Sequence, residues 1–206
     1  MELREILQGG ARKADRAGAF TLIELLVVIT VIAILMALLF PAFKGVQDQA
    51  KRTQAKNDVT QIVTAVNAFY TEYGRYPTTA TTDADARFGP GSASTNDALL
   101  NELRAVVFTL NSRKIVFIIP PDAKNQTTPR SGIQTSTGQY FDPWGTPYAI
   151  ALDGDYDSQL PNPYSSNAGS TPLRSGVISW SLGKDISGGS GDKKVDPNED
   201  DVISWQ

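Results

Sequence analysis

The sequence FTLIELLVVITVIAILMALLFPAF, residues 20–43, contains only three clearly polar side chains, those of Thr21, Glu24 and Thr30. An α-helix rises about 1.5 Å per residue, so about 20 helical residues cross the hydrocarbon core of a bilayer. The run is therefore long enough to span a membrane once. The rest of the 206-residue chain has no comparable run, and the sequence predicts a short leader, one membrane helix and one water-exposed domain.

The position of this run near the N-terminus also allows a secretory signal peptide. Such signals have an apolar core of about 7 to 15 residues, followed by a small-residue cleavage site. This run is longer and ends in Pro41, Phe43 and Lys44, which favours a helix that stays on the protein. The positive-inside rule does not decide the orientation, because Lys and Arg residues are equally numerous before the run and just after it.

The composition excludes several kinds of chemistry. The chain has no His and no Cys, so imidazole base catalysis, thiolate nucleophiles, zinc clusters and disulfides are ruled out. Nineteen Lys and Arg residues against twenty-two Asp and Glu residues give a net charge of −3 and a pI near 5.0. Nucleic-acid binding usually needs a basic balance, and we expect no nucleic-acid partner.

Beyond the membrane run, apolar residues recur at spacings of three and four from Val59 to Tyr73, which is the period of an amphipathic helix. We expect this helix to end near Gly74 and before Pro77. The sequence thus predicts one long helix, with residues 20–43 in the membrane and residues 44–76 forming a soluble amphipathic half.

Residues 77–206 are predicted to form a globular domain. Residues 78–95 are rich in Thr, Ala, Gly and Ser and indicate a loop, after which Thr95 or Asn96 is expected to cap a helix reaching about Leu110. Short apolar runs predict strands at 115–119, 148–152, 177–182 and 202–205. Early helices and late strands indicate an α+β fold, with a small antiparallel sheet on the end of the long helix. The three tryptophans are interpreted as core residues.

The segment Ala19-Phe20-Thr21-Leu22-Ile23-Glu24-Leu25 resembles the class III signal of type IV pilins and type II secretion pseudopilins. The resemblance implies that a prepilin peptidase cuts between Ala19 and Phe20 on the cytoplasmic side. Residues 1–19 would then be a cleaved leader, and Phe20 would become the N-methylated first residue of a protein that keeps its apolar helix. The family usually has glycine before the cut, where this chain has the small residue Ala19.

The resemblance gives Glu24 and Pro41 roles in assembly. A carboxylate inside a membrane helix costs roughly 3 kcal/mol on insertion scales, and the family reading pairs Glu24 with the amino group of Phe20 on a neighbouring subunit. The alternative is that Glu24 reaches the membrane interface. Pro41 matches a family proline and removes one helix hydrogen bond, which permits either a kink with local melting or a simple break at the membrane exit.

Four C-terminal motifs look like those of major pseudopilins, at residues 70–77, 142–148, 181–185 and 200–205. This resemblance implies a calcium site in the C-terminal loop. Its ligands would be the carbonyls of Leu182 and Ser187 with the side chains of Asp185, Asn198, Asp200 and Asp201. Calcium takes six to eight oxygen ligands, and the alternative is a solvated acidic turn. Asp153, Asp155 and Asp157 form a second acidic set, for which an Asp-Gly hairpin turn is the simpler interpretation.

The resemblance therefore implies a structural subunit of the type II secretion pseudopilus rather than an enzyme. Such a subunit sits in the bacterial inner membrane with a periplasmic domain and polymerises with itself through its N-terminal helix. Its other partners would be prepilin peptidase, other pseudopilins and the inner-membrane secretion platform. One alternative is a type IV pilin or minor pilin for adhesion, motility or DNA uptake. Another is a membrane-tethered periplasmic binding module or hydrolase, which would need a ligand-sized pocket with convergent polar groups.

Overall fold

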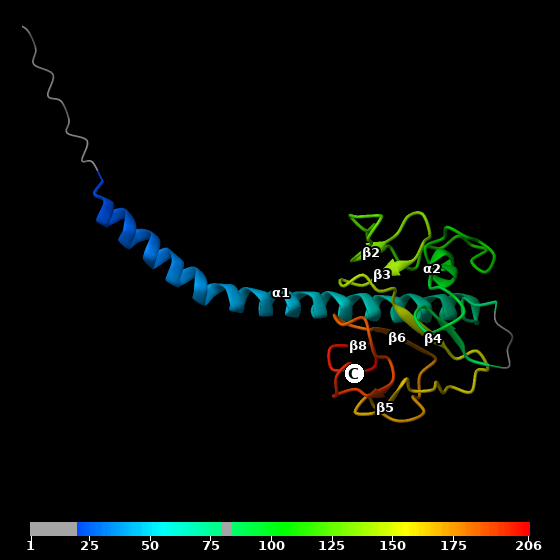
Figure 1. Ribbon diagram of the computed structural model, residues 1–206. Helices are drawn as coiled ribbons and strands as arrows, with labels where there is room; N and C mark the ends of the chain where they lie inside the picture. Colours follow the sequence, from blue (N-terminus) through cyan, green and yellow to red (C-terminus); the bar gives the residue numbers. More distant parts are fainter. Residues whose placement is uncertain (1–19, 80–83) are drawn as a thin grey trace, which may run out of the picture. The chain divides into compact units, whose positions relative to one another are not determined.

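A computed structural model of the protein describes residues 20–79 and 84–206, without the side chains of residues 40–42. The chain divides into two compact units, residues 1–45 and 46–206. One long helix, α1 (Leu22–Tyr73), contributes to both units (Figure 1). It ends where Gly74 adopts a positive φ of 66° and its N–H donates to the carbonyl of Tyr70 at 2.8 Å. A left-handed glycine is a common helix stop, and the predicted end near Gly74 is confirmed.

Within the second unit, α1 buries one stripe of side chains. The fully buried members recur at the helical spacing, and they are Ala55, Val59, Ile62, Val66 and Phe69. They belong to one apolar cluster with residues of the sheet, including Ile150, Leu152 and Val177. The helix passes alongside the strands β4 (Ala149–Leu152) and β6 (Val177–Ser181) in Figure 1. The amphipathic pattern that predicts this half of the helix is therefore the face that packs on the domain.

The sheet has four antiparallel strands in the order β1-β4-β6-β8. They are β1 (Ala86–Phe88), β4 (Ala149–Leu152), β6 (Val177–Ser181) and β8 (Val202–Ile203). Ala151 pairs with Arg87 on one side and Ile178 on the other, and Trp180 pairs with Ile203. The α+β fold is confirmed, and three of its strands lie within the predicted ranges.

Both faces of this sheet are covered. One face packs on α1, while the other carries Ala151, Ile178 and Trp180 into a second apolar cluster with Leu160 and Leu173 of the C-terminal half. Trp144 and Trp180 are buried, and Trp205 packs edge-on against Trp180 with ring centroids 6.2 Å apart. The interpretation of the tryptophans as core residues is confirmed. Smaller elements complete the domain: α2 (Asp97–Leu103) and the pairs β2 (Gly132–Ile133) with β3 (Tyr140–Phe141) and β5 (Tyr164–Ser166) with β7 (Gly191–Asp192).

The predicted helix begins where expected, with Asn96 at the N-cap position, but it is shorter than predicted and its cap residue acts differently. Helix α2 ends at Leu103, and Ala105 adopts a positive φ of 55°. The Asn96 side chain makes no capping hydrogen bond. It is fully buried, and its amide group binds main-chain atoms of Tyr140 and Tyr148. Asn96 therefore uses its side chain for tertiary contacts with Tyr140 and Tyr148, and not for the helix cap that its residue type predicts.

One strand prediction and one loop prediction are also wrong. Residues 115–119 are extended but pair with no strand among the described residues. The N–H of Phe117 donates instead to the carbonyl of Leu103 at 2.8 Å, so this segment packs along the end of α2. Conversely, the predicted loop 78–95 contains β1, which is too short to show an alternating pattern in the sequence. Gly89 ends this strand with φ 92°, where a Cβ atom would lie 2.5 Å from the carbonyl oxygen of Tyr148.

Candidate functional site

The N-terminal part of α1 presents a continuous apolar surface. Every side chain from residue 20 to residue 39 is exposed in the single chain, and Leu22 is 88% exposed. Among the described residues, one helix, α1, is both long enough and apolar enough to cross a membrane. An apolar surface of this extent marks contact with a membrane or with another protein.

At the start of α1, Thr21 and Glu24 form a reciprocal cap. The N–H and the hydroxyl of Thr21 donate to Oε2 of Glu24 at 2.9 and 2.7 Å, while the N–H of Glu24 lies 3.3 Å from the hydroxyl oxygen of Thr21. This is a capping box, which satisfies amide groups left free by the first helical turn. The sequence interpretation missed it, although the Thr-x-x-Glu spacing is visible in the sequence.

The predicted processing and assembly residues are only partly described. Phe20 is 78% exposed, directly before the capping box. Ala19 lies outside the described residues, and so does the side chain of Pro41, although α1 is helical through that position. The predictions for cleavage after Ala19 and for a kink at Pro41 remain predictions. For Glu24, both short contacts with Thr21 use Oε2, so Oε1 is available to a group from outside the chain.

In the C-terminal loop, Asp185 and Asp200 turn toward backbone amides. Oδ2 of Asp200 accepts hydrogen bonds from the N–H groups of Lys184 and Asp185, and Oδ1 of Asp185 accepts one from Ser187 at 2.8 Å. Asp185 and Ser187 are exposed, and Leu182 is half-buried where β6 ends. In the part of the chain that the structure describes, the carboxylates of Asp185, Asp200 and Asp201 do not form a cluster of three.

Two other predicted ligands, Asn198 and Asp201, lie together and are buried. Oδ2 of Asp201 accepts the hydroxyl of Tyr164 at 2.7 Å and the N–H of Gly189 at 3.1 Å. Neither Oδ1 of Asp201 nor Oδ1 of Asn198 has a hydrogen-bond partner among the described residues. A Cβ atom on Gly188 would lie 2.7 Å from Oδ1 of Asn198 and 2.7 Å from Oδ2 of Asp201, so both side chains face the same glycine.

Burial raises the pKa of Asp201 to about 6, because removing a carboxylate from water disfavours its charged form. Leaving two buried oxygens without donors also costs free energy. Carboxylate and amide oxygens are the ligand types that calcium prefers. Asn198 and Asp201 therefore fit a hard cation, whereas Asp185 and Asp200 would have to turn away from their amides to join them.

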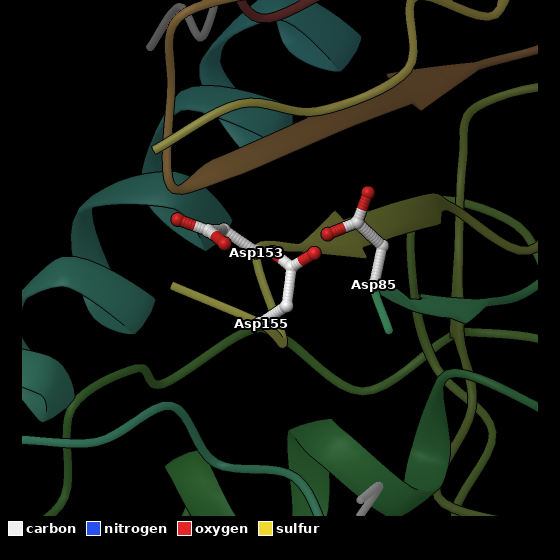
Figure 2. A group of neighbouring side chains, drawn as sticks. All are labelled: Asp85, Asp153 and Asp155. Atoms are coloured by element: carbon white, nitrogen blue, oxygen red, sulfur yellow. The ribbon is translucent and has the colours of Figure 1, made fainter. Parts of the chain in front are cut away.

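A separate acidic cluster consists of Asp85, Asp153 and Asp155, whose carboxylate oxygens lie within 4.8 Å of one another (Figure 2). Asp153 is buried and accepts the N–H groups of Asp157 and Ser158 at 3.1 and 2.8 Å. Burial first, and then the neighbouring carboxylates, raise the pKa values of Asp85 and Asp153. The sequence interpretation missed Asp85, because only the pairing of β1 with β4 brings it to this loop.

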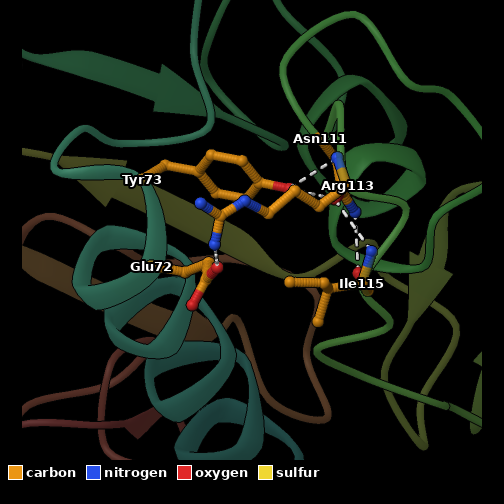
Figure 3. A network of polar contacts seen from close by, with 5 residues as sticks. All are labelled: Glu72, Tyr73, Asn111, Arg113 and Ile115. Atoms are coloured by element: carbon orange, nitrogen blue, oxygen red, sulfur yellow. Dashed lines mark hydrogen bonds and ion pairs between the residues drawn. The ribbon is translucent and has the colours of Figure 1, made fainter.

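A polar network fixes the segment after α2 to the end of α1 (Figure 3). The hydroxyl of Tyr73 donates to Oδ1 of Asn111 at 2.7 Å and accepts the N–H of Arg113 at 3.0 Å. The side chain of Asn111 also binds both main-chain groups of Ile115, and Arg113 forms an ion pair with Glu72. These partners are all in the protein, so the network is structural.

Parts of the sequence are similar to known proteins. Residues 15–40 match the family described as the prokaryotic N-terminal methylation motif. The type II secretion system core protein G of Klebsiella michiganensis is 26% identical over 173 residues, which cover 84% of this chain and 99% of that protein. The protein of the same name from Pseudomonas aeruginosa is 42% identical over 60 residues, which cover 29% of this chain and 42% of that protein. No solved structure gives a significant match.

A pilin is also among the relatives. The type IV major pilin protein PilA of Myxococcus xanthus is 39% identical over 66 residues, which cover 32% of this chain and 30% of that protein. The matched part thus spans less than half the length of two of these three relatives and nearly the whole length of the third. The predicted resemblance is confirmed. The chain carries the N-terminal methylation motif of type IV pilins and is homologous to type II secretion core protein G and to the pilin PilA.

Proposed function

We propose that this protein is a structural subunit of a type II secretion pseudopilus, which a prepilin peptidase processes and which polymerises through its N-terminal helix. The observation that carries the proposal is the run from residue 20 to residue 39, which lies within the matched methylation motif and in which every side chain is exposed in the single chain. Lipid covers such a surface before assembly, and copies of the same helix cover it afterwards. The mature protein is anchored in the inner membrane, with residues 77–206 in the periplasm.

Glu24 gives the assembly its register. The capping box holds its carboxylate at the start of the helix through Oε2, and Oε1 receives the amino group that cleavage creates on Phe20 of a neighbouring copy. Without that partner, an ionised carboxylate in a membrane helix is costly, by up to roughly 3 kcal/mol at the helix centre. Pairing removes this cost, so copies that stack with the amine beside the carboxylate are favoured over other arrangements.

A type IV pilin is the nearest alternative. The pseudopilus is favoured because the similarity to the Klebsiella secretion protein covers 84% of this chain, whereas the similarity to PilA covers 32%. A deletion strain separates the two functions. We expect loss of protein secretion with surface pili intact, and loss of pili with normal secretion would show that the protein is a pilin.

A membrane-tethered hydrolase or binding module is a poorer fit. The domain has a cavity of about 540 Å³ between β1 and α2, and some of the polar groups that line it are already engaged, although Oδ1 of Asp97 has no hydrogen-bond partner among the described residues. Glu102, for example, accepts the N–H groups of Leu110 and Asn111 at 3.1 and 2.9 Å. The named relatives are secretion and pilus proteins, which also favours a subunit without enzymatic activity.

Calcium is part of the proposal. Asn198 and Asp201 would hold it with their side-chain oxygens, together with the carbonyls of Leu182 and Ser187. Asp185 and Asp200 would join after leaving their backbone amides. The ion would supply positive charge to the buried carboxylate of Asp201 and connect the C-terminal loop to β8. The unpartnered Oδ1 atoms of Asn198 and Asp201 support this assignment.

The processing step is tested by mass spectrometry of the protein from a strain with an active prepilin peptidase. We expect an N-methylated Phe20 at the N-terminus and recovery of the protein in sheared filaments. An intact Met1 in the membrane fraction, with no polymer, would overturn the proposed function.

A further inference from the structure

A groove of about 390 Å³ on the second unit gathers three basic side chains, those of Arg52, Lys56 and Lys193. The ammonium group of Lys56 donates to main-chain oxygens of Ile203 and Gln206, and that of Lys193 donates to the carbonyl of Asn198 at 2.9 Å. These contacts hold both lysines in place through main-chain oxygens. The lysines therefore stay at the groove instead of extending into solvent.

Arg52 is the exposed member of the groove. It has no hydrogen bond or ion pair among the described residues, and the acidic side chain that its charge influences is Asp48, one turn earlier on α1, which is itself paired with Lys184. Asp201 also lines the groove, but its carboxylate is buried and already accepts the hydroxyl of Tyr164 and the N–H of Gly189. The groove thus presents the guanidinium of Arg52, which has no ion pair, beside the fixed ammonium groups of Lys56 and Lys193. Such a surface favours the binding of an acidic group.

The same chain has an acidic region of matching character. Asp85, Asp153 and Asp155 lie within 4.8 Å of one another (Figure 2) and form no ion pair within the described ranges 20–79 and 84–206. Like charges at this separation repel one another. The loop that carries Asp153 and Asp155 lies beside Tyr76, whose ring stacks on that of Tyr156 with the centroids 5.6 Å apart.

The groove and the acidic loop cannot meet within one chain. Arg52 lies early in the domain's part of α1, and the acidic loop lies just beyond its end at Tyr73. At 1.5 Å per residue, about 30 Å of helix separates Arg52 from Tyr73. A contact between the two regions therefore has to join two different copies of the chain.

We propose that the basic groove at Arg52 receives the acidic loop 153–157 of a second copy of this chain. This inference rests on the proposed function, since it assigns the contact between successive copies in the filament. A contact between two different surfaces of identical subunits is head-to-tail and continues into an open filament when the rotation does not close. Charge complementarity of this kind selects the partner and fixes the register.

Cysteine cross-linking tests the contact, because the full chain has no native cysteine. Copies carrying Arg52→Cys are assembled together with copies carrying Asp155→Cys. We expect a disulfide-linked dimer from the mixture and a ladder from the double variant. Asn67→Cys is the matched control, since this exposed residue also lies on α1 but about 22 Å further along, and we expect no cross-link between it and Asp155→Cys.

Charge reversal gives an independent readout in the full-length protein. We expect Arg52→Glu and Asp155→Arg each to lower the yield of sheared polymer about fivefold, and the combined variant to recover to within about twofold of the parent. Both side chains are exposed, so the melting temperature of each variant should stay unchanged.

The possible failures are distinguishable. A parent that makes no polymer contradicts the proposed function, whereas normal polymer without cross-link or charge effect contradicts only this inference. If Arg52→Glu weakens binding to phosphatidylglycerol vesicles and leaves the polymer yield unchanged, the groove binds a lipid headgroup and the proposed contact between copies is wrong. The acidic loop serves a cation instead if Asp155→Arg removes a response to calcium chloride and Arg52→Glu does not rescue it.

Discussion

The two parts of α1 show how one helix can serve two different environments. From residue 20 to residue 39 every side chain is exposed in the single chain, whereas from Ala55 to Phe69 one stripe is fully buried against the domain. The second part has its partners within its own chain, and its apolar residues follow the helical period. The first part is apolar all round, and its partners must come from lipid or from other copies.

The comparison predicts that equal truncations in the two parts have unequal effects on folding. Phe69→Ala removes a fully buried ring that packs on Tyr73 and Phe117, and we expect it to lower the free energy of unfolding by about 3 to 5 kcal/mol. Leu35→Ala removes an exposed side chain and should leave the domain's stability unchanged. Denaturation of the full-length chain in detergent measures both, and equal losses would contradict the division of roles.

Glu24 tests whether the first part depends on charge or on capping. Glu24→Gln keeps a capping-box side chain but removes the negative charge, and Glu24→Ala removes both. We expect both variants to lose polymer at least tenfold, because the lost pairing corresponds to roughly 3 kcal/mol. Neither should change the unfolding of the domain. If Glu24→Gln assembles as the parent does, the capping box alone explains the residue and the pairing with Phe20 is wrong.

Asp201 tests the calcium proposal through pH. Its pKa is raised by burial to about 6 in the folded protein, against 3.8 as its ordinary value. Between these two values the folded state binds more protons, so stability falls as pH rises from about 4 to 6 and stays lower above that. A shift of roughly two pKa units corresponds to about 2 to 3 kcal/mol.

The measurement compares the melting temperature of the parent with that of Asp201→Asn from pH 4 to 8, with calcium chloride and with chelator. Asp201→Asn should remove this part of the pH dependence and respond less to calcium. Calcium should stabilise the parent more at pH 7 than at pH 4.5, because it binds the ionised carboxylate of the native state. A parent that melts at the same temperature with calcium and with chelator contradicts the metal proposal.

The sequence predicted those parts of the molecule whose signal is local and repeated. The apolar run, the period of α1, its end at Gly74 and the strands β4, β6 and β8 all follow from such patterns. Strand β1 was missed because three residues cannot show an alternation. The role of Asn96 was missed because its partners, Tyr140 and Tyr148, are distant in sequence.

The candidate sites divide in the same way. The Thr-x-x-Glu spacing of Thr21 and Glu24 is visible in the sequence. Because the residues lie in a predicted membrane helix, Glu24 was interpreted as a buried charge and its role in the helix cap was missed. In the C-terminal loop, the pairing of Asn198 with Asp201 around Gly188 depends on the path of residues 188–197, which only the structure describes. Asp85 joins Asp153 through strand pairing between β1 and β4, which no local pattern predicts.

The smallest expected effect concerns the boundary between α1 and the domain, where Tyr73 closes the network in Figure 3. Tyr73→Phe keeps the ring against Phe69 but leaves Oδ1 of Asn111 and the N–H of Arg113 without the hydroxyl. A lost hydrogen bond of this kind costs about 1 kcal/mol, and hydrogen exchange should increase at Arg113 and Ile115. Tyr70→Phe is the matched control, because the Tyr70 hydroxyl has no hydrogen bond among the described residues and the residue is 39% exposed. If the two variants lower the stability equally, ring packing and not the Tyr73 hydroxyl holds the end of α1. The buried part of the helix would then differ from the exposed part only in its apolar contacts.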